Sequence, residues 1–155
     1  MSSFKIIQLS PVPLEEYELM DHVDIDDDPL LNSISDGWEE DDRKHGLQDA
    51  FYALKEIGTV NRKSRTFSFF GKEKIKKRYA ESMERVFMLW RNKMNAGKAG
   101  LAEYQLRTFS REACEIDALF YYQDRLHGAS CLIADYLDGT LPSTLHVGSV
   151  FDAHR

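Results

Sequence analysis

The sequence predicts an α+β fold in which three to four helices pack on a small, mostly antiparallel sheet. The clearest observation is a helical stretch at about 72–96, where apolar residues recur every three or four positions and no proline intervenes. Segments 4–9 and 65–70 are short and rich in β-branched or aromatic residues, as strands are. With 155 residues, 43% of them apolar, the chain is long enough to form a single domain over 1–155.

The first third of the chain is divided by prolines and by acidic residues. The strand at 4–9 should end at the two prolines that follow it, because proline enforces an extended connection. Residues 21–42, the acidic excursion, are predicted to be loop-rich yet ordered within the domain, since they hold too many apolar residues for a disordered tail. A helix should follow, beginning near Trp38 or Asp42 and ending at Ile57.

A strand hairpin and the long helix form the middle of the chain. Residues 59–60 and 65–70 should pair across a turn that includes Asn61. Gly71 then leads into the long helix and Gly97 ends it, because glycine readily adopts the left-handed conformation of a C-cap. The apolar residues of this helix are expected to line one of its faces: Ile75, Tyr79, Met83, Val86, Phe87, Trp90 and Met94.

The last third contains an ambiguous region, residues 101–126, which fits both the helical and the strand period. We favour a helix from about Ser110, a good N-cap residue, to Leu126. A shorter helix that ends at Gly139 and a last strand at 144–151 complete the fold. This last strand is predicted to lie beside the first one, because chain ends are often close together.

Charge is strongly segregated along the chain. The net charge of −6 is made up of −11 in residues 1–50, +9 in residues 51–100 and −4 in the remaining 55 residues. Such asymmetry predicts electrostatic contact, either inside the molecule or with a charged partner.

The sequence lacks the signals of a membrane protein and of a secreted protein. It has no run of about eighteen apolar residues, so no membrane span is expected. The N-terminal residues lack the basic region, apolar core and cleavage site of a secretory signal. Cys114 and Cys131 form no Cys-x-x-Cys pair, and we expect both to be reduced thiols in a cytoplasmic protein.

The leading functional hypothesis is a non-catalytic interaction or inhibitor protein that acts through charged surfaces. Its partner would be a nucleic-acid-handling protein whose basic groove the acidic excursion enters as a phosphate mimic. The sequence has no Gly-x-Ser-x-Gly, phosphate-loop or dinucleotide-binding motif, which also favours a regulatory protein over an enzyme. The carboxylates concerned are Asp24, Asp26, Asp27, Asp28, Asp36, Glu39, Glu40, Asp41 and Asp42.

A first alternative is a direct nucleic-acid-binding protein that uses the basic stretch, residues 62–78. Its cations alternate with aromatic residues, so they could bind phosphates while an exposed ring stacks on a base. Basic residues at a helix start oppose the helix dipole, and the acidic excursion is the expected partner, within one chain or across a homodimer. The cations are Arg62, Lys63, Arg65, Lys72, Lys74, Lys76, Lys77 and Arg78.

A second alternative is a small metal-assisted enzyme built around His127, Cys131 and Asp135. These residues lie at positions i, i+4 and i+8, so they would share one face of a helix, and all three are types that bind zinc. The pattern has low specificity, and no established metal or catalytic motif accompanies it. No catalytic residue, metal or cofactor is therefore assigned from the sequence.

Overall fold

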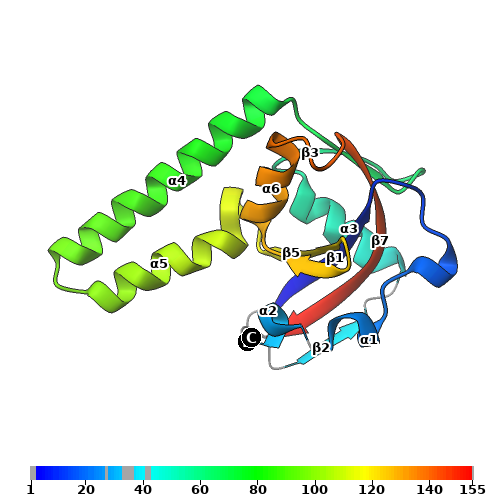
Figure 1. Ribbon diagram of the computed structural model, residues 1–155, viewed down its shortest axis with the longest axis horizontal. Coiled ribbons are helices and arrows are strands. Elements are labelled where there is room, and N and C mark those ends of the chain that lie inside the picture. Colours follow the sequence, from blue (N-terminus) through cyan, green and yellow to red (C-terminus); the bar gives the residue numbers. More distant parts are fainter. Residues whose placement is uncertain (1–2, 27, 33–36, 41–42, 155) are drawn as a thin grey trace.

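The computed structural model describes residues 3–26, 28–32, 37–40 and 43–154. It consists of a twisted sheet with helices on both faces and a pair of helices that extends away from it (Figure 1). In chain order the elements are β1 (Ser3–Ser10), η1 (Glu16–Glu18), α1 (His22–Ile25), α2 (Pro29–Asn32), β2 (Gly37–Glu40), α3 (Arg43–Leu54), β3 (Gly58–Asn61), β4 (Thr66–Phe69), α4 (Lys72–Asn95), α5 (Ala99–Glu112), η2 (Ala113–Glu115), β5 (Ala118–Tyr122), β6 (Arg125–His127), α6 (Ala129–Leu137) and β7 (Thr144–His154).

Seven strands form one mixed sheet within the described ranges, in the order β3–β4–β7–β1–β5–β6, with β2 also paired to β7. The β1–β5 pairing is parallel, and every other pairing in this sheet is antiparallel. Strand β7 is long enough to pair with β4 near its start and with β2 near its end. Ile6 of β1 lies opposite Phe151 of β7. The α+β class, the mostly antiparallel sheet and the pairing of first and last strands are therefore confirmed.

Strand β1 is buried on both faces, because its side chains alternate between two apolar layers. Ile7 and Leu9 belong to the larger layer, to which α3 and α6 contribute. Ile6 belongs to the smaller layer, which includes Ile25 of α1 and Leu31 of α2. The described part of the acidic excursion thus covers one face of the sheet, while α3 and α6 cover the other.

The predicted helix from Ser110 to Leu126 is wrong. Helix α5 has already begun at Ala99 and ends at Glu112, and the antiparallel strands β5 and β6 follow. Strand β5 lies beside β1 and is apolar throughout, so it lacks the polar alternation that distinguishes a strand from a buried helix. Gln123 and Asp124 close the hairpin with φ angles of 53° and 61°, as its two-residue turn requires.

A second difference concerns the start of α3. Of the two predicted starts, the one near Asp42 agrees with the helix, which begins at Arg43. The start near Trp38 is wrong, because residues 37–40 form β2 against β7. Glu39 and Glu40 therefore belong to a strand rather than to the first turn of a helix. An acid in that first turn would have been favoured by the helix dipole, but pairing with β7 determines the backbone here.

Helices α4 and α5 form a hairpin, residues 72–112, that projects from the body of the molecule (Figure 1). The long predicted helix is confirmed, and Gly97 turns the chain with a φ of 74°. Ile75 and Ser82, near the start of α4, are its buried residues, and this part of α4 lies against α6 and η2. Among the described helices, none has both the length and the apolar character that a bilayer crossing requires.

Candidate functional site

The projecting part of the hairpin exposes an unusual number of large hydrophobic side chains. Met88 is 65% exposed and Tyr104 is 58% exposed. Among the other described residues, only Val12, Tyr17 and Tyr52 are large hydrophobic side chains exposed to this degree. We define the hairpin surface as the seven exposed large hydrophobic residues of α4 and α5: Phe87, Met88, Leu89, Met94, Leu101, Tyr104 and Leu106.

The exposure follows from the geometry of two helices packed together without a third. Ala102 of α5 is fully buried, and its small side chain allows α4 and α5 to approach closely. Consecutive residues of an α-helix lie about 100° apart, so one neighbouring helix cannot cover all of Phe87, Met88 and Leu89. The run of apolar residues from 86 to 90 is the sequence signal for this surface, because it is wider than a single helical face. Phe87 and Met94 share the apolar face with the buried Ile75, yet both are exposed.

The hairpin is also the basic part of the molecule. Residues 72–112 contain eleven Lys and Arg residues and five Asp and Glu residues, a net charge of +6, whereas the rest of the chain carries −12. Within the described ranges, Arg91, Lys93 and Lys98 have no ion-pair partner, and they border the hairpin surface in sequence. The exposed apolar residues of the hairpin are therefore interspersed along the chain with unpaired cations.

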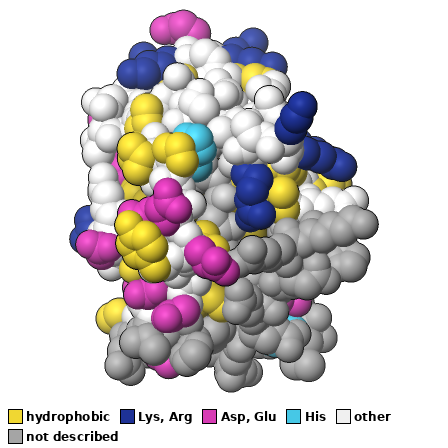
Figure 2. All heavy atoms as spheres, turned by 90° about the vertical axis from the view of Figure 1, so that its right-hand side faces the viewer, with side chains coloured by type: hydrophobic (Ala, Val, Ile, Leu, Met, Phe, Trp, Pro, Cys, Tyr) yellow, Lys and Arg dark blue, Asp and Glu magenta, His cyan; other side chains and the backbone are white. Residues whose placement is uncertain are grey.

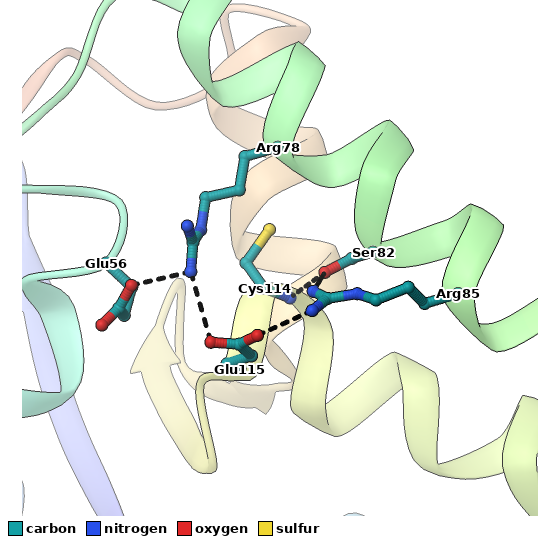
Figure 3. Close-up of polar contacts among 6 residues, drawn as sticks. All are labelled: Glu56, Arg78, Ser82, Arg85, Cys114 and Glu115. Carbon is teal, nitrogen blue, oxygen red and sulfur yellow. Dashed lines mark hydrogen bonds and ion pairs between the residues drawn. The ribbon is translucent and has the colours of Figure 1, made fainter.

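A network of ion pairs connects the base of the hairpin to the rest of the molecule (Figure 3). Arg78 of α4 donates a 2.7 Å hydrogen bond to Glu56, in the turn between α3 and β3, and lies 3.6 Å from Glu115. Arg85, two turns further along α4, donates a 2.8 Å bond to the other oxygen of Glu115. This bond, together with the charges of both arginines, lowers the pKa of Glu115.

The hydroxyl of Ser82 completes the network from inside the protein. Its Oγ accepts hydrogen bonds from the backbone N–H of Cys114 at 3.1 Å and from Arg85 at 3.2 Å. Cys114 and Glu115 have φ angles of 57° and 64°, a left-handed conformation that is uncommon for residues other than glycine. Burial raises the pKa of the Cys114 thiol, although its bond to Ser82 opposes the shift. Two strained residues are thus held where α5 returns to the sheet.

The basic stretch is only partly available for binding phosphate. Arg78 is engaged by Glu56 and Glu115, and Arg65 donates a hydrogen bond to the carbonyl of Gly148. Lys74 lies 3.8 Å from the ring centre of Phe70. Arg62, Lys63, Lys72, Lys76 and Lys77 are exposed.

The aromatic side chains of the basic stretch point away from solvent. Phe67 is fully buried and Phe69 is nearly so, with its ring stacked on Tyr136 at 4.1 Å. Neither ring can stack on a base in this conformation. In the described ranges, no cation of the basic stretch pairs with the acidic excursion.

The acidic excursion is described only in part, and its carboxylates largely serve local structure. Asp24 accepts a bond from the backbone N–H of Asp21, and Asp28 accepts bonds from the start of α2 and from the backbone N–H of Leu126. Asp26 is exposed. The face in Figure 2 shows acidic side chains scattered among hydrophobic and uncharged ones. Asp27, Asp36, Asp41 and Asp42 lie outside the described residues, and the side chains of Glu39 and Glu40 do as well.

His127, Cys131 and Asp135 come together, although not on one helix as predicted. His127 ends β6, whereas Cys131 and Asp135 lie one turn apart on α6. Their potential ligand atoms all lie within 4.8 Å of one another. The neighbouring Tyr122 of β5 donates a 2.6 Å hydrogen bond to Asp135, and its ring stacks on His127 at 3.8 Å.

Two shallow clefts flank the loop that follows β1. One has a volume of about 310 Å³ and lies between this loop and the start of β7, with Arg65 and His146 among its polar lining. The other has a volume of about 370 Å³ and is bordered by Asp21, Asp24 and the β5–β6 turn. Neither contains a set of catalytic groups within hydrogen-bond reach of one another.

Comparisons of the chain with protein-family models, with curated proteins and with solved structures found no match.

Proposed function

We propose that this protein is a non-catalytic interaction protein that docks onto a protein partner through the hairpin surface. The observation that carries the proposal is that a projecting two-helix hairpin bears seven exposed large hydrophobic residues. Exposed apolar patches of this kind are typical of interaction sites, because leaving them in water is unfavourable. Aromatic residues and methionine are also the types enriched in interfaces.

The charge of the hairpin specifies the chemistry of the partner. Arg91, Lys93 and Lys98 would lie at the rim of the contact, where they steer an oppositely charged surface into register. The partner we propose therefore presents an apolar groove bordered by acidic residues. A second hairpin carries the same charge of +6, so a symmetric contact between two hairpins is opposed by repulsion.

The network at the base of the hairpin supports this role, since a docking element works best when it is held in one orientation. Arg78, Arg85 and Ser82 link α4 to the body and to the turn after α5. The projecting half of the hairpin is thereby presented at a fixed angle to the sheet.

The experiment compares partner binding by substituted proteins. The protein is used to capture partners, and each captured protein is then purified and titrated directly by calorimetry. Met88→Glu and Tyr104→Glu should each raise the Kd by about thirtyfold or more, the effect of losing a central anchor. Tyr52→Glu on α3, at a residue 70% exposed, is the matched control and should leave the Kd unchanged.

Three outcomes would overturn the proposal. The first is that no captured protein binds directly once purified. The second is that Tyr52→Glu weakens binding as much as Tyr104→Glu does. The third is a dimer in sedimentation equilibrium that Met88→Glu dissociates, because the hairpin surface would then be occupied by a second copy.

We propose the acidic excursion as a second contact, on a partner that handles nucleic acid, through which the protein would act as an inhibitor. The net charge of −12 outside the hairpin and the exposed carboxylate of Asp26 support this contact. Asp26→Asn combined with Glu39→Gln and Glu40→Gln should then weaken inhibition of that partner, with a loss that shrinks at high salt. Unchanged inhibition would remove the acidic excursion from the proposal.

A titration with fluorescent DNA and RNA oligomers tests the basic stretch separately. Because Phe67 and Phe69 are buried, we expect only weak binding that disappears at physiological salt. Tight binding at that salt, lost on changing Lys74, Lys76 and Lys77 to Glu, would instead make nucleic acid the direct ligand.

A further inference from the structure

We propose that His127, Cys131 and Asp135 form a zinc-binding site whose fourth position is open to solvent. The site is distinct from the hairpin surface and does not depend on it. A nitrogen, a sulfur and an oxygen ligand together suit a borderline metal ion such as Zn²⁺.

The distances are close to those of a bound site. The three ligand atoms lie within 4.8 Å of one another, and Cys131 Sγ is 3.8 Å from Asp135 Oδ2. In a tetrahedral zinc site the ligand atoms are separated by roughly 3.3–3.8 Å, as bond lengths of about 2.0–2.3 Å require. Closure by about 1 Å is therefore needed, which rotation of the Cys131 and Asp135 side chains can supply.

The state of His127 independently points to a missing ligand. The residue is only 5% exposed, and within the part of the chain that the structure describes neither ring nitrogen has a hydrogen-bond partner of normal geometry. A buried polar group without a partner is destabilising, so such groups call for an explanation. A metal ion bound to one nitrogen would supply it.

Tyr122 orients the site from its inner side. Its hydroxyl donates a 2.6 Å bond to Asp135 Oδ2 and lies 4.0 Å from Cys131 Sγ, while its ring stacks on His127. A hydrogen bond to a liganding carboxylate is the usual outer support of a metal site.

The cluster of His127, Cys131 and Asp135 is open to solvent on one side, so an ion can reach it. Cys131 is exposed, whereas His127 behind it is buried. Three protein ligands with one solvent-facing position leave room for water or for a group from a partner.

A Cys–His nucleophile is the competing interpretation of the same residues. Such a nucleophile needs the imidazole within hydrogen-bond reach of the thiol. The contacts of Cys131 Sγ are instead with Asp135 at 3.8 Å and with Tyr122 at 4.0 Å, and the ring of His127 has no hydrogen-bond partner of normal geometry among the described residues. A divalent cation suits this arrangement, because it stabilises a thiolate and a carboxylate together. The geometry therefore favours a metal ligand over a nucleophile.

The test uses the full chain without a histidine tag, stripped with a chelator and titrated with Co²⁺ and then Zn²⁺. We expect one equivalent of Co²⁺ to produce a sulfur-to-cobalt charge-transfer band, and one equivalent of Zn²⁺ to remove it. Cys131→Ser should abolish that band. Loss of a residue that only hydrogen-bonds to a metal ligand typically weakens metal binding ten- to hundredfold, and Asp135→Asn should raise the Kd for Zn²⁺ by more than this. Tyr122→Phe should raise it within that range.

Two substitutions serve as matched controls. Cys114→Ala removes the other thiol, and His146→Ala removes a histidine outside the cluster; both should keep the band and the Kd. Circular dichroism checks that each protein is folded. The absence of a charge-transfer band in the unsubstituted protein, or equal zinc binding by Cys131→Ser, would overturn the proposal.

Discussion

The backbone N–H of Cys114 donates a 3.1 Å hydrogen bond to the Oγ of Ser82, so a buried hydroxyl in α4 holds the turn that ends α5. Ser82 is 5% exposed although it lies in a helix whose other residues are mostly exposed. The turn needs this support because Cys114 and Glu115 both have a positive φ. This hydrogen bond thus links α4 to the turn that follows α5.

Replacing this serine should loosen the base of the hairpin. Ser82→Ala leaves the buried N–H of Cys114 without an acceptor, and the free energy of unfolding should fall by about 1–3 kcal/mol. Urea denaturation monitored by circular dichroism measures the change. Ser143→Ala, at an exposed serine, should change it by less than about 0.5 kcal/mol. Equal stability of the two proteins would mean that the bond contributes nothing net.

Glu115 should make stability depend on pH in the acid range. Arg85 and Arg78 lower its pKa in the folded protein, so its contribution is present above the pKa of the unfolded chain. It is lost as pH falls through the lower folded pKa, where the carboxylate is protonated. Denaturant midpoints of the unsubstituted protein and of Glu115→Gln should therefore differ at pH 7 and converge in strong acid. A difference that is constant from pH 7 to strong acid would contradict this account.

Replacing two glycines by alanine should change the stability of the protein in opposite directions. A Cβ at Gly58 would lie 2.3 Å from the backbone oxygen of Ser68 and from the ring of Phe67, and neither can move without disturbing the β3–β4 pairing. Gly58→Ala should lower the free energy of unfolding by about 1–3 kcal/mol. Gly100, in the first turn of α5, has no such neighbour, and Gly100→Ala should raise stability by up to about 1 kcal/mol. Thermal melts of both proteins provide the comparison.

The side chain of Gln8 should be essential for holding the loop after β1 in place. Its Oε1 accepts bonds from the backbone N–H groups of Met20 and Ser149, and its Nε2 donates to the carbonyl of Glu18. Gln8→Ala removes all three and should lower the free energy of unfolding by at least about 2 kcal/mol. Gln48→Ala, at an exposed glutamine of α3, is the control. Faster amide exchange at Met20 and Ser149 would show that the loop itself is released.

Local patterns in the sequence determined the elements whose residues keep one period and end at clear signals. The helix at 72–95 is read from its apolar spacing and from Gly97, and β1 and β4 from their β-branched or aromatic runs. Strand β5 was missed because it is buried on both sides, beside β1 and under α6, and this erases the polar alternation. The exposure of Phe87 and Met94 could not be read from the sequence, because spacing shows which residues share a face but not whether that face is covered.

For the candidate sites too, some features were determined by the sequence and others by the tertiary structure. The sequence by itself determined the segregation of charge, the long helix and the spacing of Cys131 and Asp135, since these depend only on residue types and short-range geometry. The tertiary structure decided that Arg78 is engaged by Glu56 and Glu115, because such partners meet only when distant segments pack. It also decided that α4 and α5 project without a third helix. The physical reason is that burial, ion pairing and exposure depend on what packs against a residue, and the residue's own neighbours in the chain do not specify that.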